Sequence, residues 1–353
     1  MSFRYIGSKA RVVAQIAEHL GAPKGHVFVD VFCGTGAVAE MAADRGWKIR
    51  LNDHLSSATT MAEARLLSAR DTPFSRLGGY ETVIARLNEE RAIEGFIWSE
   101  YSPASVAKIG LERRYFTEQN AGRIDAIRAR IESWHDSNEI NAKEKTLLVA
   151  DLLAAANRVA NIAGTYGCFL AKWTPQSAGD LELRARARKK KLVAIETSNL
   201  NATQVKVSPA DLVYLDPPYT KRQYASYYHI LETIALGDTP VVEGVAGLRP
   251  WKDLASDYCY KVRALRALCG LIDRLTANHI LLSYSNEGHI DLTDLMLNLD
   301  SIGRVRMHEL AGVGRYRPNV QASAKRASVN EYLIEIEKQP ITRAVQQERL
   351  VFA

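Results

Sequence analysis

The stretch FVDVFCGTGAV, residues 28–38, decides the fold class. Its first half is β-branched and aromatic, as in a buried strand, and Gly34 and Gly36 break that strand before the alanine-rich pattern AVAEMAADRG. That pattern predicts a helix that ends at Gly46. Residues 47–53, WKIRLND, predict a second strand. A strand, a glycine turn, a helix and another strand together indicate the start of a doubly wound parallel sheet.

The rest of the chain divides this sheet in sequence. From about residue 56 to about residue 191, amphipathic helical patterns such as TTMAEARLLSAR and KEKTLLVADLLAAANRVA dominate. Strand and helix patterns then alternate again in ADLVYLD, YKVRALRALCGLIDRLTA, HILLSYS, DLTDLMLNLD, RVRMHEL and EYLIEIE. We therefore expect an α/β fold with a Rossmann-like, doubly wound and mostly parallel sheet. Residues 1–58 and 192–353 are expected to form one domain, and residues 59–191 a largely helical insertion.

Composition limits the class of protein. A chain of 353 residues with 47% hydrophobic content can bury a large core. No stretch is apolar for long enough to cross a bilayer, and the N-terminus lacks the apolar run of a signal peptide, so we expect a cytoplasmic protein without a membrane partner. The four cysteines lack metal-ligand spacing, which predicts reduced thiols and no metal. They are Cys33, Cys168, Cys259 and Cys269.

Basic residues are in excess. The formal charge is +6 and the sequence pI is about 9.0, which fits a polyanionic partner but does not require one. RARARKKK, residues 184–191, is the densest basic run, and a solvated helix face or loop would explain it as well as a binding surface. A looser second cluster contains Arg315, Arg317, Lys325 and Arg326.

Two features in the first part of the chain predict a ligand at the sheet edge. Gly34 and Gly36 let the backbone turn closely around a bound group, although any turn from strand to helix can use glycine. The third glycine of a dinucleotide fingerprint and the Gly-Lys-Ser/Thr of a phosphate loop are both missing. Asp53 ends the second strand about 20 residues later, where a carboxylate can accept hydrogen bonds from ribose hydroxyls. The alternative is that Asp53 caps the helix that starts near Ser56.

YLDPPY, residues 214–219, is the third feature. The two prolines cannot donate to a sheet ladder, so the strand that arrives through residues 211–214 ends there. A strand followed by a proline turn is the structural alternative. The motif would place Asp216 at the carboxyl edge of a central strand, with Tyr219 beside it. Because the lone pair of an exocyclic base amine is delocalised, a carboxylate and a fixed carbonyl that accept its N–H groups would make the nitrogen a better nucleophile.

Together, FRYIGSK at residues 3–9, DVFCGTG, LND and DPPY resemble the S-adenosylmethionine-dependent DNA adenine-N6 methyltransferases of the Dam-like or D12 class. Their order is that of the α arrangement, with the cofactor motif before a target-recognition insertion and the catalytic motif after it. The resemblance implies that residues 1–58 and 192–353 form the catalytic domain. It assigns residues 59–191 to target recognition.

The resemblance also implies roles for individual residues. Asp216, Pro217, Pro218 and Tyr219 form the catalytic motif, in which Asp216 and the Pro217 carbonyl contact the target amine and Tyr219 stacks on a flipped-out adenine. The cofactor-binding residues are Tyr5, Lys9, Asp30, Gly34, Gly36, Asp53, Asn199 and Asp216. Lys9 would pair with the methionine carboxylate and Asp53 with the ribose. In ETSNLNATQ the family usually has an acidic residue at the cofactor's adenine, and this chain offers Asn199 or Asn201 instead.

The implied function is site-specific transfer of the methyl group of S-adenosylmethionine to N6 of adenine in double-stranded DNA. Cytosine-N4 methylation poses the same chemical problem and is one alternative, and an inactive DNA-binding relative is another. The residues expected to contact phosphates are Arg184, Arg186, Arg188, Lys189, Lys190, Lys221 and Arg222. A restriction endonuclease that acts on the same site is a further candidate partner.

Overall fold

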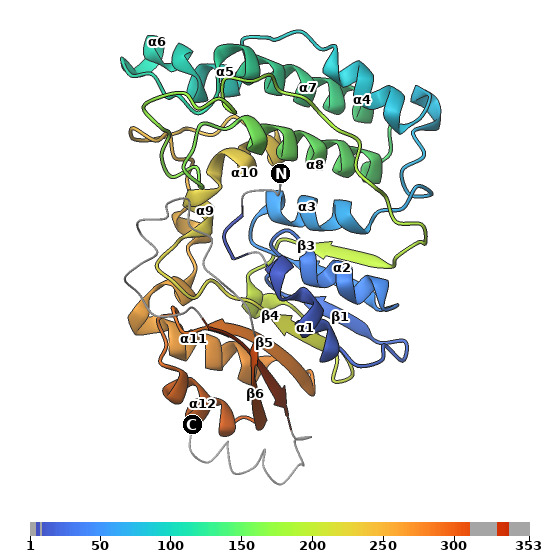
Figure 1. Ribbon diagram of the computed structural model, residues 1–353, viewed down its shortest axis with the longest axis vertical. Helices are drawn as coiled ribbons and strands as arrows, with labels where there is room; N and C mark the ends of the chain where they lie inside the picture. Colours follow the sequence, from blue (N-terminus) through green and yellow to red (C-terminus); the bar gives the residue numbers. More distant parts are fainter. Residues whose placement is uncertain (1–4, 8, 311–329, 339–353) are drawn as a thin grey trace.

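A computed structural model of the chain describes residues 5–7, 9–310 and 330–338, and Figure 1 shows a sheet below a layer of helices. The strands are β1 Val27–Asp30, β2 Lys48–Asn52, β3 Ile195–Ser198, β4 Leu212–Leu215, β5 His279–Ser285, β6 Arg304–Leu310 and β7 Glu331–Glu337. The α-helices are α1 Val13–Glu18, α2 Ala37–Asp44, α3 Ser56–Leu66, α4 Tyr80–Asn88, α5 Phe96–Tyr101, α6 Val106–Ile109, α7 Glu118–Asp136, α8 Ala142–Val159, α9 Tyr224–Tyr227, α10 His229–Leu236, α11 Lys261–Arg274 and α12 Leu292–Asp300.

The seven strands form one sheet in the order β3-β2-β1-β4-β5-β7-β6. Strands β3, β2, β1, β4 and β5 are parallel, and β7 is antiparallel to both of its neighbours. The strand order reverses direction between β1 and β4, and the crevice beyond the carboxyl ends at such a point is where open α/β sheets bind ligands. The predicted Rossmann-like, mostly parallel sheet is therefore confirmed.

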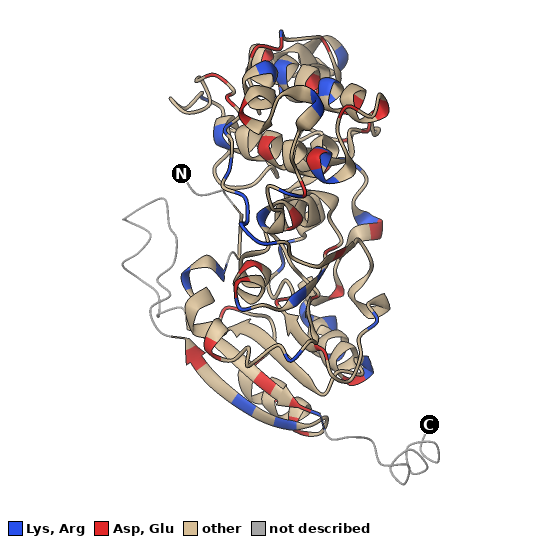
Figure 2. Cartoon of the chain, turned by 90° about the vertical axis from the view of Figure 1, so that its right-hand side faces the viewer, with Lys and Arg blue, Asp and Glu red and all other residues tan. Residues whose placement is uncertain are grey.

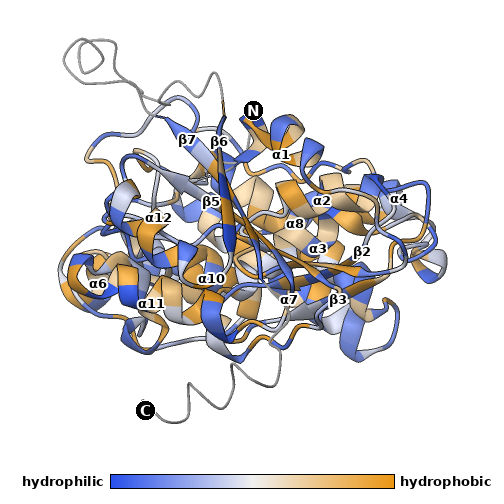
Figure 3. Cartoon of the chain, turned by 90° about the horizontal axis from the view of Figure 1, so that it is seen from below, coloured by the Kyte–Doolittle hydropathy of each residue, from blue (hydrophilic) through white to orange (hydrophobic). Residues whose placement is uncertain are grey.

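Alternating side chains of the strands face two hydrophobic layers. Phe28 of β1 packs in the cluster that contains residues of α1, α2 and α3, whereas Val29 packs in the cluster that contains residues of α11 and α12. This period of two is what a strand buried on both faces requires. Figure 3 shows the hydrophobic segments gathered where helices such as α2 and α3 approach the strands.

The insertion has a helical core of its own. Helices α7 and α8 pack against each other, and α8 also contacts α3 and α10. Asn141 and Glu144 form a capping box that begins α8, which satisfies two of the orphan donors at its N-terminus. The expected boundary between residues 58 and 59 falls inside α3, a helix that packs against both α2 and α8. The division into two domains stays a prediction.

Two elements were not predicted from sequence. Strand β3 has the sequence IETS and lies at the sheet edge with largely exposed side chains, so it lacks a hydrophobic pattern. Helix α10 follows the catalytic motif in sequence but packs against α3 and α8 rather than the sheet. It therefore fastens the region after the motif to the helical layer.

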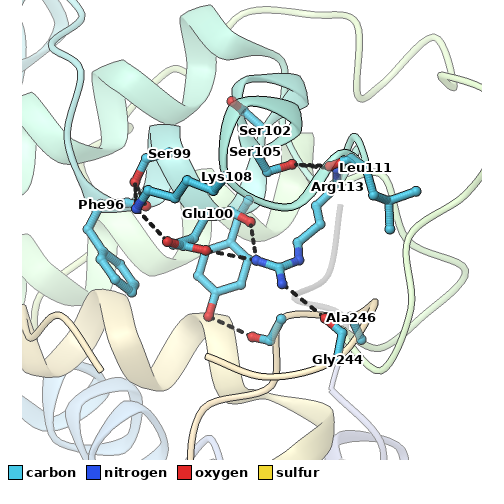
Figure 4. A network of polar contacts seen from close by, with 12 residues as sticks. Phe96, Ser99, Glu100, Ser102, Ser105, Lys108, Leu111, Arg113, Gly244 and Ala246 are labelled. Carbon is cyan, nitrogen blue, oxygen red and sulfur yellow. Dashed lines mark hydrogen bonds and ion pairs between the residues drawn. The ribbon is translucent and has the colours of Figure 1, made fainter. Parts of the chain in front are cut away.

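A buried arginine makes a second connection between these regions (Figure 4). Arg113 is 2% exposed, and its guanidinium donates to Glu100 at 2.8 Å and to the carbonyl of Gly244 at 2.9 Å. Lys108 contacts the other oxygen of Glu100 at 2.6 Å. Because Gly244 lies outside the insertion in sequence, the loop around it is held to the helical layer by a paired, hydrogen-bonded charge.

Candidate active site

The glycine turn after β1 places its two glycines differently. Both have left-handed φ angles, +48° for Gly34 and +78° for Gly36. A Cβ on Gly34 would lie 3.1 Å from the ring of Tyr5, and Gly34 lines a cavity. A Cβ on Gly36 would lie 2.7 Å from the backbone of Ala62. Gly34 therefore shapes the cavity wall, whereas Gly36 allows α2 to approach α3 closely.

Asp53 follows β2 and closes the turn. One carboxylate oxygen accepts from the backbone N–H of Gly34 and the other from that of Leu55, both at 3.0 Å. The first N–H groups of α3, on Ser56 and Ser57, donate instead to Glu232 of α10 at 2.9 Å each. The alternative reading of Asp53 as the cap of this helix is therefore wrong. Burial raises the pKa of Asp53 to about 6.

Asp216 follows β4 directly, two residues after Tyr214, which pairs with Asp30 at the end of β1. Burial raises its pKa to about 6, although Lys9 opposes this rise. Pro217 is buried, and Pro218 lines the same cavity as Gly34. The ring of Tyr219 packs edge to face against Tyr284 with centroids 5.6 Å apart. The prolines thus end β4 and hold a carboxylate at the carboxyl edge of the central strands.

Lys9 contacts carboxylates of the protein itself. Its ammonium lies 3.2 Å from Asp216 and 2.8 Å from Glu331, and 5.2 Å from the centre of the Tyr219 ring. The side chain is 5% exposed. Burial alone would lower the pKa of Lys9, but Asp216, Tyr219 and Glu331 together raise it well above the usual value. Its predicted pairing with the methionine carboxylate stays a prediction.

Sequence reasoning missed Glu331 at this site. It begins β7, and the pattern EYLIEIE by itself indicates only a strand. Because β7 runs antiparallel to β5, with Glu331 opposite Ser285, its first residue lies at the edge where the parallel strands end. Only the pairing direction, which the sequence does not state, brings this carboxylate to Lys9. Glu232 was also missed, because it reaches α3 from a helix that is distant in sequence.

A cavity of about 380 Å³ joins these groups. The predicted residues that line it are Tyr5, Lys9, Asp30, Gly34, Asp53, Asp216 and Pro218. The structure describes four other predicted residues that do not line the cavity, namely Gly36, Asn199, Pro217 and Tyr219. Asn199 donates from its side chain to the carbonyl of Asp53 at 2.9 Å and to Thr59 at 3.0 Å, so it supports the turn from outside. Asn201, the other candidate, does line the cavity.

The cavity is electrostatically suited to a positively charged ligand. Asp30 is 2% exposed, and its Oδ1 has no hydrogen-bond partner among the described residues. Burial raises the pKa of Asp30 well above the usual value, and Asp216 and Asp53 add to the rise. A buried carboxylate oxygen without a hydrogen-bond partner is costly unless a ligand pairs with it. The positively charged sulfonium and ammonium groups of S-adenosylmethionine fit a cavity lined by these carboxylates.

Apolar surface around the same cavity comes from Cys33 and from the aromatic rings of Tyr5, Phe32, Tyr224 and Tyr258. Tyr5 stacks on Tyr228 with centroids 4.6 Å apart. All four cysteines fall in the described part of the chain and are free thiols. Burial raises the pKa of Cys33 well above the usual value, which disfavours a nucleophilic thiolate there.

The basic run lies elsewhere and is largely paired within the protein. Arg186 contacts the buried carboxylate of Asp151 at 2.6 Å, and Arg188 lies over the ring of Tyr80 at 4.8 Å. Lys189 contacts Asp44, the last residue of α2, at 2.6 Å. Because α2 begins beside the glycine turn, its last residue lies away from the cavity. Figure 2 shows basic and acidic segments interspersed over the molecule.

The other predicted DNA contacts differ in exposure. Within the described residues, Arg184 forms an ion pair only with exposed Glu182, and Lys190 is exposed. Lys221 and Arg222 are exposed directly after the catalytic motif, and no ion pair involves them within residues 9–310 and 330–338. The role of all seven residues in DNA binding stays a prediction. The second basic cluster, Arg315, Arg317, Lys325 and Arg326, lies outside the described residues.

Three groups of side chains among the described residues have the composition of a metal site, and one of them is considered in detail because it joins distant parts of the chain. Ligand atoms of His19, His308 and Glu335 lie within 4.8 Å of one another. The oxygens of Glu335 already accept from His279 at 2.8 Å and contact His308 at 3.4 Å, and Arg306 lies 3.8 Å away. These contacts account for the group as a hydrogen-bonded cluster, so we assign no ion to it. Across the described residues, every helix is too short or too polar to cross a membrane.

Comparisons with known proteins agree with this geometry. The family model for D12 class N6 adenine-specific DNA methyltransferases matches residues 5–296. This range contains the glycine turn, Asp53 and the motif at residues 216–219, and it ends before β6 and β7.

Several curated proteins are similar over most of the chain. Type II methyltransferase M.FokI of Planomicrobium okeanokoites is 34% identical over 95% of this chain and 52% of its own length. Modification methylase StsI of Streptococcus sanguinis is 32% identical over 96% of this chain and 52% of its own length. Type II methyltransferase M.NlaIII of Neisseria lactamica is 32% identical over 86% of both chains. The chain thus spans about half the length of the first two relatives.

Proposed function

Since the chain belongs to the family of D12 class N6 adenine-specific DNA methyltransferases, we propose that it transfers the methyl group of S-adenosylmethionine to N6 of an adenine within a specific site in double-stranded DNA. One observation carries the proposal. The carboxylate of Asp216 stands at the carboxyl end of β4, beside Pro217 and Pro218, on the wall of a cavity that also contains Asp30 and Asp53. A donor pocket and an acceptor for the target amine thus share one edge.

The methyl donor would be held by the end of β1 and the end of β2. Asp53 is oriented by the N–H groups of Gly34 and Leu55, and each of its oxygens keeps a lone pair for a ribose hydroxyl. Asp30 would face the cationic part of the ligand. When bound, S-adenosylmethionine supplies a methyl group on a sulfonium sulfur that becomes a neutral thioether.

Asp216 would act on the target amine. Lys9 contacts its Oδ1, and no hydrogen bond or ion pair of the described residues involves Oδ2, which is thus available to accept an N–H of adenine. The Pro217 carbonyl is the proposed second acceptor. As the nitrogen gains the methyl group it must lose a proton, and a carboxylate whose pKa is about 6 is ionised and able to take it near neutral pH.

Tyr219 would hold the flipped-out base. Its hydroxyl donates to Glu331 at 3.2 Å, and its ring is fixed by Tyr284 and by the ammonium of Lys9. A ring restrained in this way offers a stacking surface at little additional cost in conformational entropy.

The helical insertion is the proposed target-recognition region, and the exposed Lys221 and Arg222 are the proposed phosphate contacts nearest the motif. A restriction endonuclease for the same site is a proposed partner, because the similar proteins include type II methyltransferases and modification methylases. Cytosine-N4 methylation is the alternative reaction, and Asp rather than Ser at the head of the motif favours adenine. An inactive DNA-binding relative is disfavoured by the intact motif.

The test is methyl transfer from tritiated S-adenosylmethionine to duplex DNA of mixed sequence, with the modified nucleosides separated after digestion. We expect label in N6-methyl-2′-deoxyadenosine and a limited set of methylated sequences. Label in N4-methyl-2′-deoxycytidine would select the alternative reaction. Bound cofactor with no transfer to any duplex would refute the enzymatic proposal.

A further inference from the structure

Glu331 joins the active site from a part of the chain that the family match does not reach. The match ends at residue 296, whereas Glu331 begins β7 and is 8% exposed. Strand β7 lies between β5 and β6, with Glu331 opposite Ser285 and Leu310. The antiparallel direction of this strand is what delivers a carboxylate to the edge where β1 and β4 end.

The two oxygens of Glu331 are used separately. Oε2 accepts from the ammonium of Lys9 at 2.8 Å, and Oε1 accepts from the hydroxyl of Tyr219 at 3.2 Å. Lys9 is in turn 3.2 Å from Asp216, so its contact with Glu331 is the shorter of the two. One buried carboxylate therefore holds both the lysine that contacts the catalytic aspartate and the ring beside that aspartate.

We propose that Glu331 is a positioning residue of the methyltransferase site: it restrains Lys9 from closing on Asp216 and fixes the orientation of Tyr219. This inference rests on the proposed function, because it concerns the group that accepts the target amine. Without Glu331 the single ammonium would serve Asp216 alone. A carboxylate in a closer ion pair accepts a hydrogen bond from a neutral amine less well, because its charge is already compensated.

The charged and titratable groups around Asp216 predict a characteristic pH effect. They are Lys9, Glu331, Asp30, Tyr214, Tyr219 and Tyr224. After burial, which raises the pKa of Asp216, Lys9 lowers it and Glu331 raises it. Removing the charge of Glu331 should therefore lower this pKa. If ionised Asp216 is the active form, the acidic limb of the rate profile moves to lower pH while the plateau rate falls.

The experiment compares Glu331→Gln with the unmodified protein in kcat measured from pH 4.5 to 8 at saturating S-adenosylmethionine and duplex DNA. Glutamine keeps the size and an acceptor but removes the charge. We expect the acidic limb to move down by about one pH unit, the usual scale for one nearby charge, and the plateau to fall about tenfold. Affinity for S-adenosylmethionine should not change. Tyr219→Phe should reduce the plateau by a smaller factor without moving the limb.

Two further variants separate positioning from folding. Glu331→Asp keeps the charge on a shorter side chain, so it should lower the plateau while leaving the limb near that of the unmodified protein. Glu337→Gln, at the other end of β7, removes a carboxylate 3.4 Å from Arg306 and should leave both quantities unchanged. An unchanged profile in Glu331→Gln, or a loss of stability and cofactor binding without a shifted limb, would overturn the proposal.

Failure of the proposed function has a different signature, because the unmodified protein itself would then transfer no methyl group. In that case the titration of Asp216 can still be followed by carboxyl ¹³C NMR on the free protein, with Asp216→Asn identifying the resonance. A lower midpoint in Glu331→Gln would support the proposed restraint of Lys9, and an unchanged midpoint would refute it.

Discussion

The cavity at the carboxyl edge of the sheet and the basic run at residues 184–191 differ in whether their polar groups have partners within the protein. Asp30, Asp53 and Asp216 line the cavity, and Lys9 contacts Asp216 and Glu331. Oδ1 of Asp30 has no hydrogen-bond partner among the described residues. Along the basic run, arginines and lysines contact carboxylates, a carbonyl or a ring of the protein itself.

The difference shows that local charge density in a sequence does not identify a binding surface. The run RARARKKK is the densest charge in the chain, yet its contacts with α2, α4 and α8 make it a strap that carries the chain back from the insertion. At the cavity, whose acids are far apart in sequence, a buried oxygen of Asp30 lacks a hydrogen-bond partner among the described residues. A buried polar group without a partner is the better indicator of a ligand.

The largest expected effect comes from removing the acceptor at the cavity. Asp216→Ala should lower kcat by about 10³-fold, the scale for losing a preorganised group that stabilises developing charge. Lys9 keeps Glu331 as a partner, so the protein should remain folded and bind DNA. Single-turnover methyl transfer and a DNA-binding assay measure the two properties. Retained transfer would exclude Asp216 from contact with the amine.

Removing an internal contact of the basic run should lower the stability of the protein rather than its affinity for DNA. Arg186→Ala leaves the carboxylate of Asp151, which is 1% exposed, with the hydroxyl of Tyr80 as its remaining hydrogen-bond partner among the described residues. We expect a loss of about 3 kcal/mol in the free energy of unfolding, as for a buried ion pair that loses one member. Denaturant titration measures it, and Arg184→Ala, whose ion pair with Glu182 is exposed, is the matched control. Equal stabilities of the two variants would contradict the structural role of the run.

Asp53 tests the other end of the cavity. Asp53→Ala should weaken binding of S-adenosylmethionine by about 10²-fold, because hydrogen bonds from two ribose hydroxyls to a charged group are lost. Isothermal titration calorimetry measures the effect. Asn199→Ala, which removes a side chain outside the cavity, should weaken binding much less. If the two variants bound equally well, Asp53 would not hold the ribose.

The smallest expected effect concerns DNA affinity. Replacing exposed Lys221 and Arg222 by alanine should reduce the slope of log affinity against log salt by about 2, since each lost phosphate contact contributes about 0.9. The same change at Arg188 and Lys189, which already contact Thr72 and Asp44 of the protein, should leave the slope nearly unchanged. Fluorescence anisotropy with one duplex at several salt concentrations compares them. Equal reductions would restore the basic run as a DNA-binding surface.

Local patterns predicted the parts of the fold that local physics determines. Strands β1, β4 and β5 were predicted because each is an almost continuous run of buried residues. In β2, buried Ile49 and Leu51 alternate with Lys48 and Arg50. The glycines at the turn after β1 have left-handed backbone angles, as a tight turn requires. Strand β3 was not, because its exposed side chains carry no hydrophobic pattern.

Tertiary contacts account for what the sequence could not show at the site. Asp53 and Asp216 follow strands, so their places could be inferred from strand ends. The partners of Lys9 could not, because they depend on the antiparallel pairing of β7 and on a buried position that no residue near Lys9 in sequence indicates.

The contact between Lys9 and Glu331 can form only late in the synthesis of the chain. The two residues are 322 positions apart, so a ribosome that adds about 5–20 residues per second makes the lysine roughly 15–65 s before its partner. During that interval the strands that carry Asp30 and Asp53 have left the peptidyl transferase centre, while the last strand of the sheet does not yet exist. The growing chain therefore contains Asp30 and Asp53 early in synthesis, whereas the carboxylate that pairs with Lys9 from β7 is added only late.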